Sequence, residues 1–223
     1  MEAIREPRTS DDAVSATAAA PGAEGHVPPA ARLSIASGLA LLAGMLCSFG
    51  QAVPGLGVLS NSAGPWFVVA ALLVLLVGQH RRPALPMVLG VVFLQLMHVG
   101  YWATTNLRGY PDVLSVTNPW VLLGVPAGLL AGAVVWALRS APAPFGAAAA
   151  GVSGAVLVGE GVRGLLQVAA TTGTTFWTAE ILVGVVVVGA GVLTARTPLT
   201  RVVALGTGLL GAMGVLGVYL LLG

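Results

Sequence analysis

The segment Gly159-Glu160-Gly161-Val162-Arg163-Gly164 places a carboxylate and a guanidinium three residues apart inside an apolar stretch, residues 145–169. This stretch is long enough to cross a membrane as a helix, because a hydrocarbon core of about 30 Å needs about 20 apolar residues. A charged side chain at the centre of such a helix costs roughly 2.5–3.5 kcal/mol on insertion scales. Glu160 and Arg163 therefore need a structural or a functional explanation.

The composition excludes an ordinary water-soluble domain. Charged residues make up 8% of the 223 residues and hydrophobic residues 57%, whereas soluble domains contain about 25% charged residues. The basic residues are all arginine and form no patch for nucleic acid. One cysteine, Cys47, and three dispersed histidines predict no disulfide, no metal site and no cofactor. Since no nucleophile–base pair or phosphate-binding loop is found either, we expect no enzyme.

The chain divides into a polar tail and seven apolar runs. Residues 1–30 lack a periodic apolar pattern and are expected to be a disordered tail. Residues 31–223 are expected to form a bundle of seven transmembrane helices, because in lipid a helix satisfies its own backbone groups. The fold class is therefore an all-α, polytopic membrane protein. The runs lie near residues 31–53, 65–80, 84–106, 119–138, 145–169, 175–195 and 199–222.

Arginine residues at alternate helix ends predict the orientation in the membrane. One side carries Arg32, Arg81, Arg82, Arg139, Arg196 and Arg201, while the other carries Arg108, offset by Asp112. Cytoplasmic loops are enriched in arginine and lysine, so we expect a cytoplasmic N-terminus and an external C-terminus. The same orientation places four tryptophans near the outer surface, either as an interfacial aromatic belt or as ligand-stacking groups: Trp66, Trp102, Trp120 and Trp177.

Small residues recur at every fourth position in several of the runs. The spacing is clearest at Gly124, Gly128 and Gly132, and it recurs at Ala147, Gly151, Ala155 and Gly159, at Ala36, Ala40, Gly44 and Ser48, and at Ala204, Gly208 and Ala212. Such stripes let helix backbones approach closely. They predict either packing within one bundle or a docking face for a second copy or another membrane subunit.

Polar side chains gather in the outer halves of four helices. In the fifth run Ser153, Glu160, Arg163 and Gln167 fall within about 80° of one another at 3.6 residues per turn. A second stripe contains Gln95 and His98, and the first and sixth runs add Gln51 and Glu180. The candidate ligand-binding residues are Glu160, Arg163, His98, Gln95, Gln167, Gln51 and Glu180.

Three interpretations of these polar residues stay open. In the first, Arg163 pairs with Glu160 or Glu180 and the set locks the bundle, as in a structural or partner-docking protein without a ligand. In the second, the residues line an outward-facing pocket for a small polar or anionic solute, with Arg163 as the counter-ion. In the third, His98 and Glu160 handle protons. Solute recognition or transport is the function that we expect, with the structural role as its alternative.

Three short motifs carry a resemblance to a known family. They are Ser48-Phe49-Gly50-Gln51-Ala52-Val53-Pro54-Gly55, then Asn61-Ser62-Ala63-Gly64-Pro65-Trp66, then Gly100-Tyr101-Trp102 followed by Arg108-Gly109. The chain resembles a family of small bacterial multi-pass membrane proteins that is catalogued as a domain of unknown function. The resemblance implies a protein of the bacterial cytoplasmic membrane and names no substrate. A looser likeness connects the first small-residue stripe to the substrate-binding subunits of energy-coupling-factor vitamin transporters.

Overall fold

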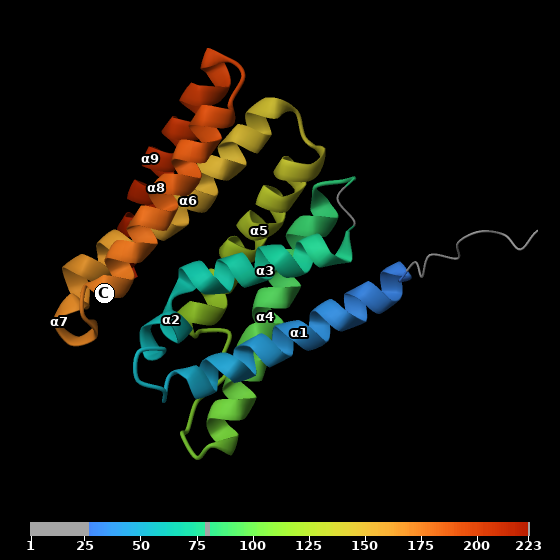
Figure 1. The fold of residues 1–223 in the computed structure, drawn as a ribbon. Helices are drawn as coiled ribbons and strands as arrows, with labels where there is room; N and C mark the ends of the chain where they lie inside the picture. Colours follow the sequence, from blue (N-terminus) through green and yellow to red (C-terminus); the bar gives the residue numbers. More distant parts are fainter. Residues whose placement is uncertain (1–26, 79–80, 223) are drawn as a thin grey trace, which may run out of the picture.

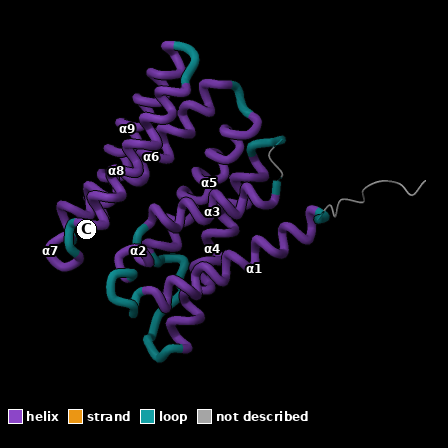
Figure 2. The backbone as a smooth tube through the Cα atoms, in the orientation of Figure 1, coloured by secondary structure: helices purple, strands orange, loops and turns teal. Residues whose placement is uncertain are grey.

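The computed structural model of the chain describes residues 27–78 and 81–222, and every regular element in them is a helix. The elements are α1 (Pro29–Gly50), α2 (Gly57–Asn61), α3 (Ala63–Val77), α4 (Ala84–Leu107), α5 (Pro119–Ser140), α6 (Ala143–Gln167), α7 (Ala169–Thr172), α8 (Thr175–Thr194) and α9 (Pro198–Leu222) (Figures 1 and 2). The predicted disordered tail lies outside the described residues, except that its last residues begin α1.

The prediction of an all-helical membrane protein is confirmed, and six of the described helices are long and apolar enough to cross a membrane: α1, α4, α5, α6, α8 and α9. The second predicted run, near residues 65–80, forms α3, which has only 15 residues. At 1.5 Å per residue α3 is about 22 Å long, shorter than a typical hydrocarbon core. It begins at Ala63, two residues before the predicted run, directly after Ser62, whose backbone is extended with φ of −87° and ψ of 135°. It ends at Val77 because Gly78 has a φ of 79°.

The long helices form two groups that meet along α5 and α6. In the first group α4 packs on α1 and α5, and α3 lies against all three. In the second group α6 packs on α8 and α9. Figure 1 shows α6, α8 and α9 running side by side, with the first group beside them. The chain therefore passes from one group to the other only once, at the turn before α6.

The two ends of this assembly differ in their charge. One end, called the arginine end, holds the start of α1, the turn before α4, the turn before α6 and the turn before α9 (Figure 1). Its arginines are Arg32, Arg81, Arg82, Arg139, Arg196 and Arg201. The opposite end, called the polar end, holds the loops at 51–56, 108–118 and 168–174. The alternation of arginines along the sequence thus becomes a difference between two faces of the protein.

The apolar core lies between the helices of the first group. Phe93 and Met97 of α4 and Val74 of α3 are fully buried there, against Ala36 and Ala40 of α1. Large apolar side chains also cover the outside of the bundle, including Leu72, Val88, Leu182, Val186 and Leu210. An apolar exterior around an apolar core is the arrangement that a lipid bilayer requires.

The small-residue stripes pack within the chain. A Cβ on Gly44 of α1 would collide with the backbone of Met97 on α4, and one on Gly132 of α5 would collide with the backbone of Pro86. Gly159 of α6 packs in the same way against Ala212 of α9. The three helix pairs therefore fill the stripes that could have docked a partner. A homodimer or another membrane subunit stays a prediction, and these stripes do not provide its surface.

Candidate functional site at the polar end

The short helix α3 begins against a glutamate from the other helix group. The backbone N–H of Ala63 donates to Oε1 of Glu160 at 2.7 Å, and the N–H of Gly64 donates to Oε2 at 2.5 Å. The hydroxyl of Tyr219 on α9 also donates to Oε1, at 3.3 Å. Glu160 is only 2% exposed. The first N–H groups of a helix have no partner within it and attract negative charge, so Glu160 caps α3 from a distance of 96 residues along the chain.

Ser62 leaves this capping position open because its side chain bonds elsewhere. A serine directly before a helix ordinarily accepts a bond from the helix N-terminus, but Ser62 makes no such bond. Its hydroxyl donates instead to Oε1 of Glu180 on α8, at 3.2 Å. Glu180 is 6% exposed, and its other carboxyl oxygen, Oε2, is buried without a hydrogen-bond partner among the residues that the structure describes. We call Ser62, Glu160, Glu180 and Tyr219, with the start of α3, the α3 clasp.

Gly64 allows the two carboxyl groups to share one space. A Cβ at this position would collide with Oε1 of Glu180 and would lie 3.3 Å from Oε2 of Glu160. Both oxygens therefore approach the same point beside the first turn of α3. The glycine in the motif Asn61-Ser62-Ala63-Gly64-Pro65-Trp66 thus leaves space for the carboxyl groups of Glu160 and Glu180.

Arg163 does not neutralise these acids, so the predicted ion pairs with Glu160 or Glu180 are wrong. Its Nε donates to Oε1 of Gln167 at 2.8 Å, and its guanidinium carbon lies 4.9 Å from the centre of the Tyr219 ring. The physical reason is that backbone N–H groups and the tyrosine hydroxyl already occupy the oxygens of Glu160. No acidic side chain in the described residues lies within ion-pair distance of Arg163.

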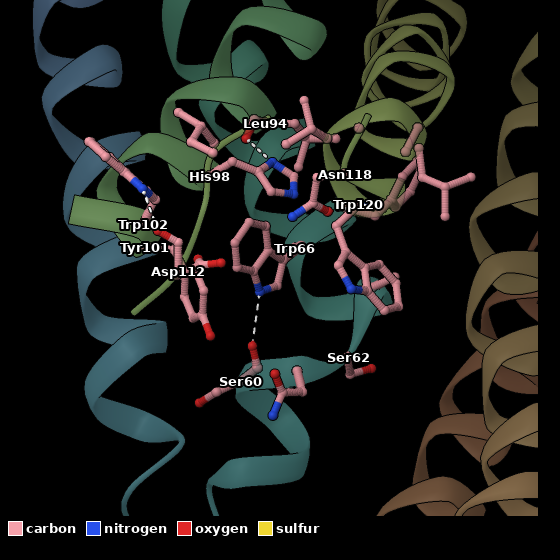
Figure 3. A pocket seen from close by; sticks show the side chains of 18 of the residues that line it. Ser60, Ser62, Trp66, Leu94, His98, Tyr101, Trp102, Asp112, Asn118 and Trp120 are labelled. Carbon is pink, nitrogen blue, oxygen red and sulfur yellow. Dashed lines mark hydrogen bonds between the residues drawn. The ribbon is translucent and has the colours of Figure 1, made fainter. Parts of the chain in front are cut away.

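A cavity of about 570 Å³ lies beside the clasp, between α3, α4 and the start of α5. Six residues with aromatic rings of the Phe, Tyr and Trp types line it, namely Trp66, Phe67, Tyr101, Trp102, Trp120 and Tyr219. Its polar lining includes Gln51, Ser60, Asn61, Ser62, His98, Asp112, Asn118 and Arg163. In Figure 3 the ring of Trp66 stands between Tyr101 and Asp112 on one side and Trp120 on the other. A wider depression, of about 920 Å³, lies between the loop at 51–58 and the segment 168–177.

Hydrogen bonds to the protein fix several of the aromatic rings in the cavity wall. Nε1 of Trp66 donates to the carbonyl oxygen of Ser60 at 3.1 Å, and Nε1 of Trp102 donates to that of Asp112 at 3.0 Å. The His98 ring lies 4.9 Å from the Trp66 ring, and its Nδ1 lies 2.8 Å from the carbonyl oxygen of Leu94. Because the indole N–H groups of Trp66 and Trp102 are already used, these two side chains offer ring faces to a ligand.

Comparison with known proteins identifies the family. The model of a family of unknown function, DUF6518, matches residues 23–223. The chain belongs to DUF6518. No curated protein and no solved structure matches it. The predicted resemblance to an uncharacterised membrane family is therefore confirmed. In this DUF6518 protein all three motifs contribute residues to the cavity, for example Gln51 from the first, Trp66 from the second and Tyr101 from the third. The likeness to vitamin-transporter subunits stays a prediction.

The DUF6518 fold brings only some of the seven predicted site residues to the cavity. Gln51, His98 and Arg163 line it. Gln51 also bonds to Asn61 at 2.5 Å and accepts from the Tyr101 hydroxyl at 3.0 Å. The other four residues lie elsewhere: Glu160 and Glu180 in the clasp behind Ser62, Gln95 on the backbone of Val121, and Gln167 on Arg163.

Sequence reasoning missed much of the cavity wall in this DUF6518 protein. Asn61 ends the short helix α2, and Ser62 links α2 to α3. Both residues belong to no apolar run, so a search for polar residues within spans does not find them. Trp66, Trp102 and Trp120 fit the ligand-stacking alternative by position. Trp177 does not behave as an interfacial residue, because it is 3% exposed and its ring packs on Gly164 of α6. Asn118 is the N-cap of α5 and also lines the cavity.

Proposed function

We propose that the protein binds a small solute in the cavity at the polar end, and that solute recognition or transport is its function. The observation that carries the proposal is the cavity itself. Its volume of about 570 Å³ lies within the range of about 300–1,000 Å³ that is typical of small-molecule sites. Its lining combines aromatic faces with a few polar groups, which is also typical of such sites.

The lining favours a solute with a flat or apolar body and a polar or anionic group. Trp66, Trp102 and Trp120 supply large apolar faces, against which such a body can pack. Arg163 supplies the positive charge, because its guanidinium meets Gln167 and the Tyr219 ring and no carboxylate in the described part of the chain. Guanidinium groups bind carboxylates and phosphates through paired hydrogen bonds.

We also propose that the cavity opens to the outside of a bacterial cytoplasmic membrane. Six arginines at the arginine end favour its placement in the cytoplasm. The N-terminus is then cytoplasmic and the C-terminus external. Single cysteines introduced by Gly109→Cys at the polar end and Arg82→Cys at the arginine end, each in a Cys47→Ala background, test this. Only Gly109→Cys should react with a membrane-impermeant thiol reagent added outside; labelling of Arg82→Cys alone would reverse the orientation.

A thermal-shift screen of the purified protein against a metabolite panel tests the binding proposal. A ligand at 100 times its Kd stabilises a protein by about 2.7 kcal/mol, which such a screen detects. A true ligand should stabilise the wild type and the Trp136→Phe control, whose tryptophan lies outside the cavity lining. It should stabilise Trp66→Phe and Arg163→Gln less. Equal stabilisation of all four proteins would place the ligand elsewhere.

The alternative function is structural or partner-docking, and the α3 clasp favours it. Glu160 joins α6 of one helix group to α3 of the other through two backbone hydrogen bonds. A protein whose polar residues serve only this connection would give no ligand in the screen, while Glu160→Gln would still lower its stability. That combination of results would turn the search toward partner subunits.

A further inference from the structure

The two carboxyl groups of the α3 clasp differ in how completely they are hydrogen-bonded. Glu160 accepts three bonds, from two backbone N–H groups and the Tyr219 hydroxyl. Glu180 accepts one bond, from Ser62, and its Oε2 is buried with no hydrogen-bond partner in residues 27–78 and 81–222. An unpaired carboxylate oxygen away from water loses its hydration without compensation, so a bound proton or cation at this oxygen would lower the cost of burying it.

The groups around the pair show which ligand fits. Among the described residues, Glu160 on α6 approaches the same point as Glu180, and Tyr219 on α9 bonds to Glu160, with Arg163 over the Tyr219 ring. Ser62, the residue before α3, donates to Glu180, and the first N–H groups of α3 lie beside it. Arg163 stacks over Tyr219 and does not reach either acid within ion-pair distance. Two ionised carboxylates at one buried point would repel each other, and shared sites of this kind hold a proton on one partner.

A proton fits this site better than a metal ion. Hard divalent cations take six or more oxygen ligands, whereas three of the four carboxyl oxygens here already accept hydrogen bonds. The donors around Glu160 are N–H and O–H groups, whose positive ends would oppose a second cation. A proton needs only one oxygen, and Oε2 of Glu180 is the one without a partner.

We propose that the Glu160–Glu180 pair is a proton-binding site that takes a single exchangeable proton on Glu180, and that this proton controls how firmly the start of α3 is held. With the proton bound, the pair carries one negative charge, which the N-terminus of α3 stabilises. When Glu180 releases its proton to water, a second negative charge faces the same N–H groups beside Glu160. The repulsion between the two carboxylates then loosens the contact between the helix groups.

The proposal does not depend on a solute, so its failure and the failure of solute binding are separate results. Infrared spectroscopy of the full-length protein in detergent, recorded as a pH titration, detects the C=O stretch of a buried protonated carboxyl group. The wild type and Asp112→Asn, which alters an acid at the cavity rim, should both show this band. Glu180→Gln should lack it. Glu160→Gln should keep the band but change the pH range over which it disappears, because the neighbouring carboxyl group is gone.

Hydrogen exchange tests the second half of the proposal on the same samples. Peptides that cover residues 57–67 should exchange faster in the wild type as the carboxyl band disappears, after correction for intrinsic rates. In Glu180→Gln, which stays neutral, their protection should not follow pH. A band that survives Glu180→Gln would overturn the proton site. If the exchange protection of residues 57–67 in the wild type did not change as the carboxyl band disappears, the proposed control of α3 by the proton would be wrong.

Discussion

Replacing Glu160 by glutamine should destabilise the protein far more than its single-atom change suggests. Both carboxylate oxygens accept bonds from the start of α3, at 2.7 and 2.5 Å. A glutamine offers one acceptor oxygen and one NH₂ group. One of the two backbone N–H groups, of Ala63 or Gly64, would therefore face another donor in a site that is 2% exposed.

The expected loss follows from these two bonds. A buried donor without a partner costs about 1–3 kcal/mol. The remaining bond changes from charge-assisted to neutral, which roughly halves a contribution of about 1.5–3 kcal/mol. Glu160→Gln should therefore lower the free energy of unfolding by about 2–4 kcal/mol. Polar contacts in membrane proteins average only about 0.6 kcal/mol, so a loss of the predicted size would distinguish helix capping from an ordinary contact.

Reversible unfolding in mixed micelles with a denaturing detergent measures this difference. Gln167→Leu is the matched control, because Gln167 lies two turns along the same helix, is exposed and bonds only to Arg163. Exposed substitutions are usually within about 0.5 kcal/mol of neutral. If Glu160→Gln were no more destabilising than Gln167→Leu, Glu160 would not cap α3 and the reasoning above would be wrong.

Two further substitutions test the packing and the cavity wall. Gly44→Ala should reduce stability by about 1–3 kcal/mol in the same unfolding assay, because its Cβ would collide with backbone atoms of Met97 and Tyr101 that cannot rotate away. Gly38→Ala, with open space around it, is the control. Equal stability of the two variants would contradict the close packing of α1 on α4. Asn118→Ala should cost about 1 kcal/mol, because the side chain accepts from the Trp120 N–H at 2.9 Å as the N-cap of α5; a stability equal to wild type would show that this cap contributes nothing.

The sequence predicts the class of the fold well because the signal is repeated along the chain. Each apolar run predicts one helix, and small residues at every fourth position predict close packing between helices. The short helix α3 is harder to predict. Its start depends on Ser62, whose extended backbone separates α3 from α2, and on Glu160, which accepts hydrogen bonds from the helix N-terminus and comes from another part of the chain.

The candidate site is predicted only in part for a similar reason. Helical periodicity places Glu160, Arg163 and Gln167 on one face, but it does not say what that face meets. Arg163 is an obvious partner for Glu160 by spacing, yet the N–H groups of α3 take that place. Residues just before α3, such as Asn61 at the end of α2 and Ser62, belong to no apolar run and enter the cavity wall only through the tertiary fold.

Tryptophan fluorescence gives the most direct test that the cavity binds a solute. The chain has five tryptophans, so a variant that keeps only Trp66 reports on the cavity, and one that keeps only Trp136 reports on a position outside it. A stabilising solute from the thermal screen should change the emission of the Trp66-only protein saturably and leave the Trp136-only protein unchanged. Saturable binding that changes Trp136 and leaves Trp66 unaffected would contradict a solute site between α3, α4 and α5.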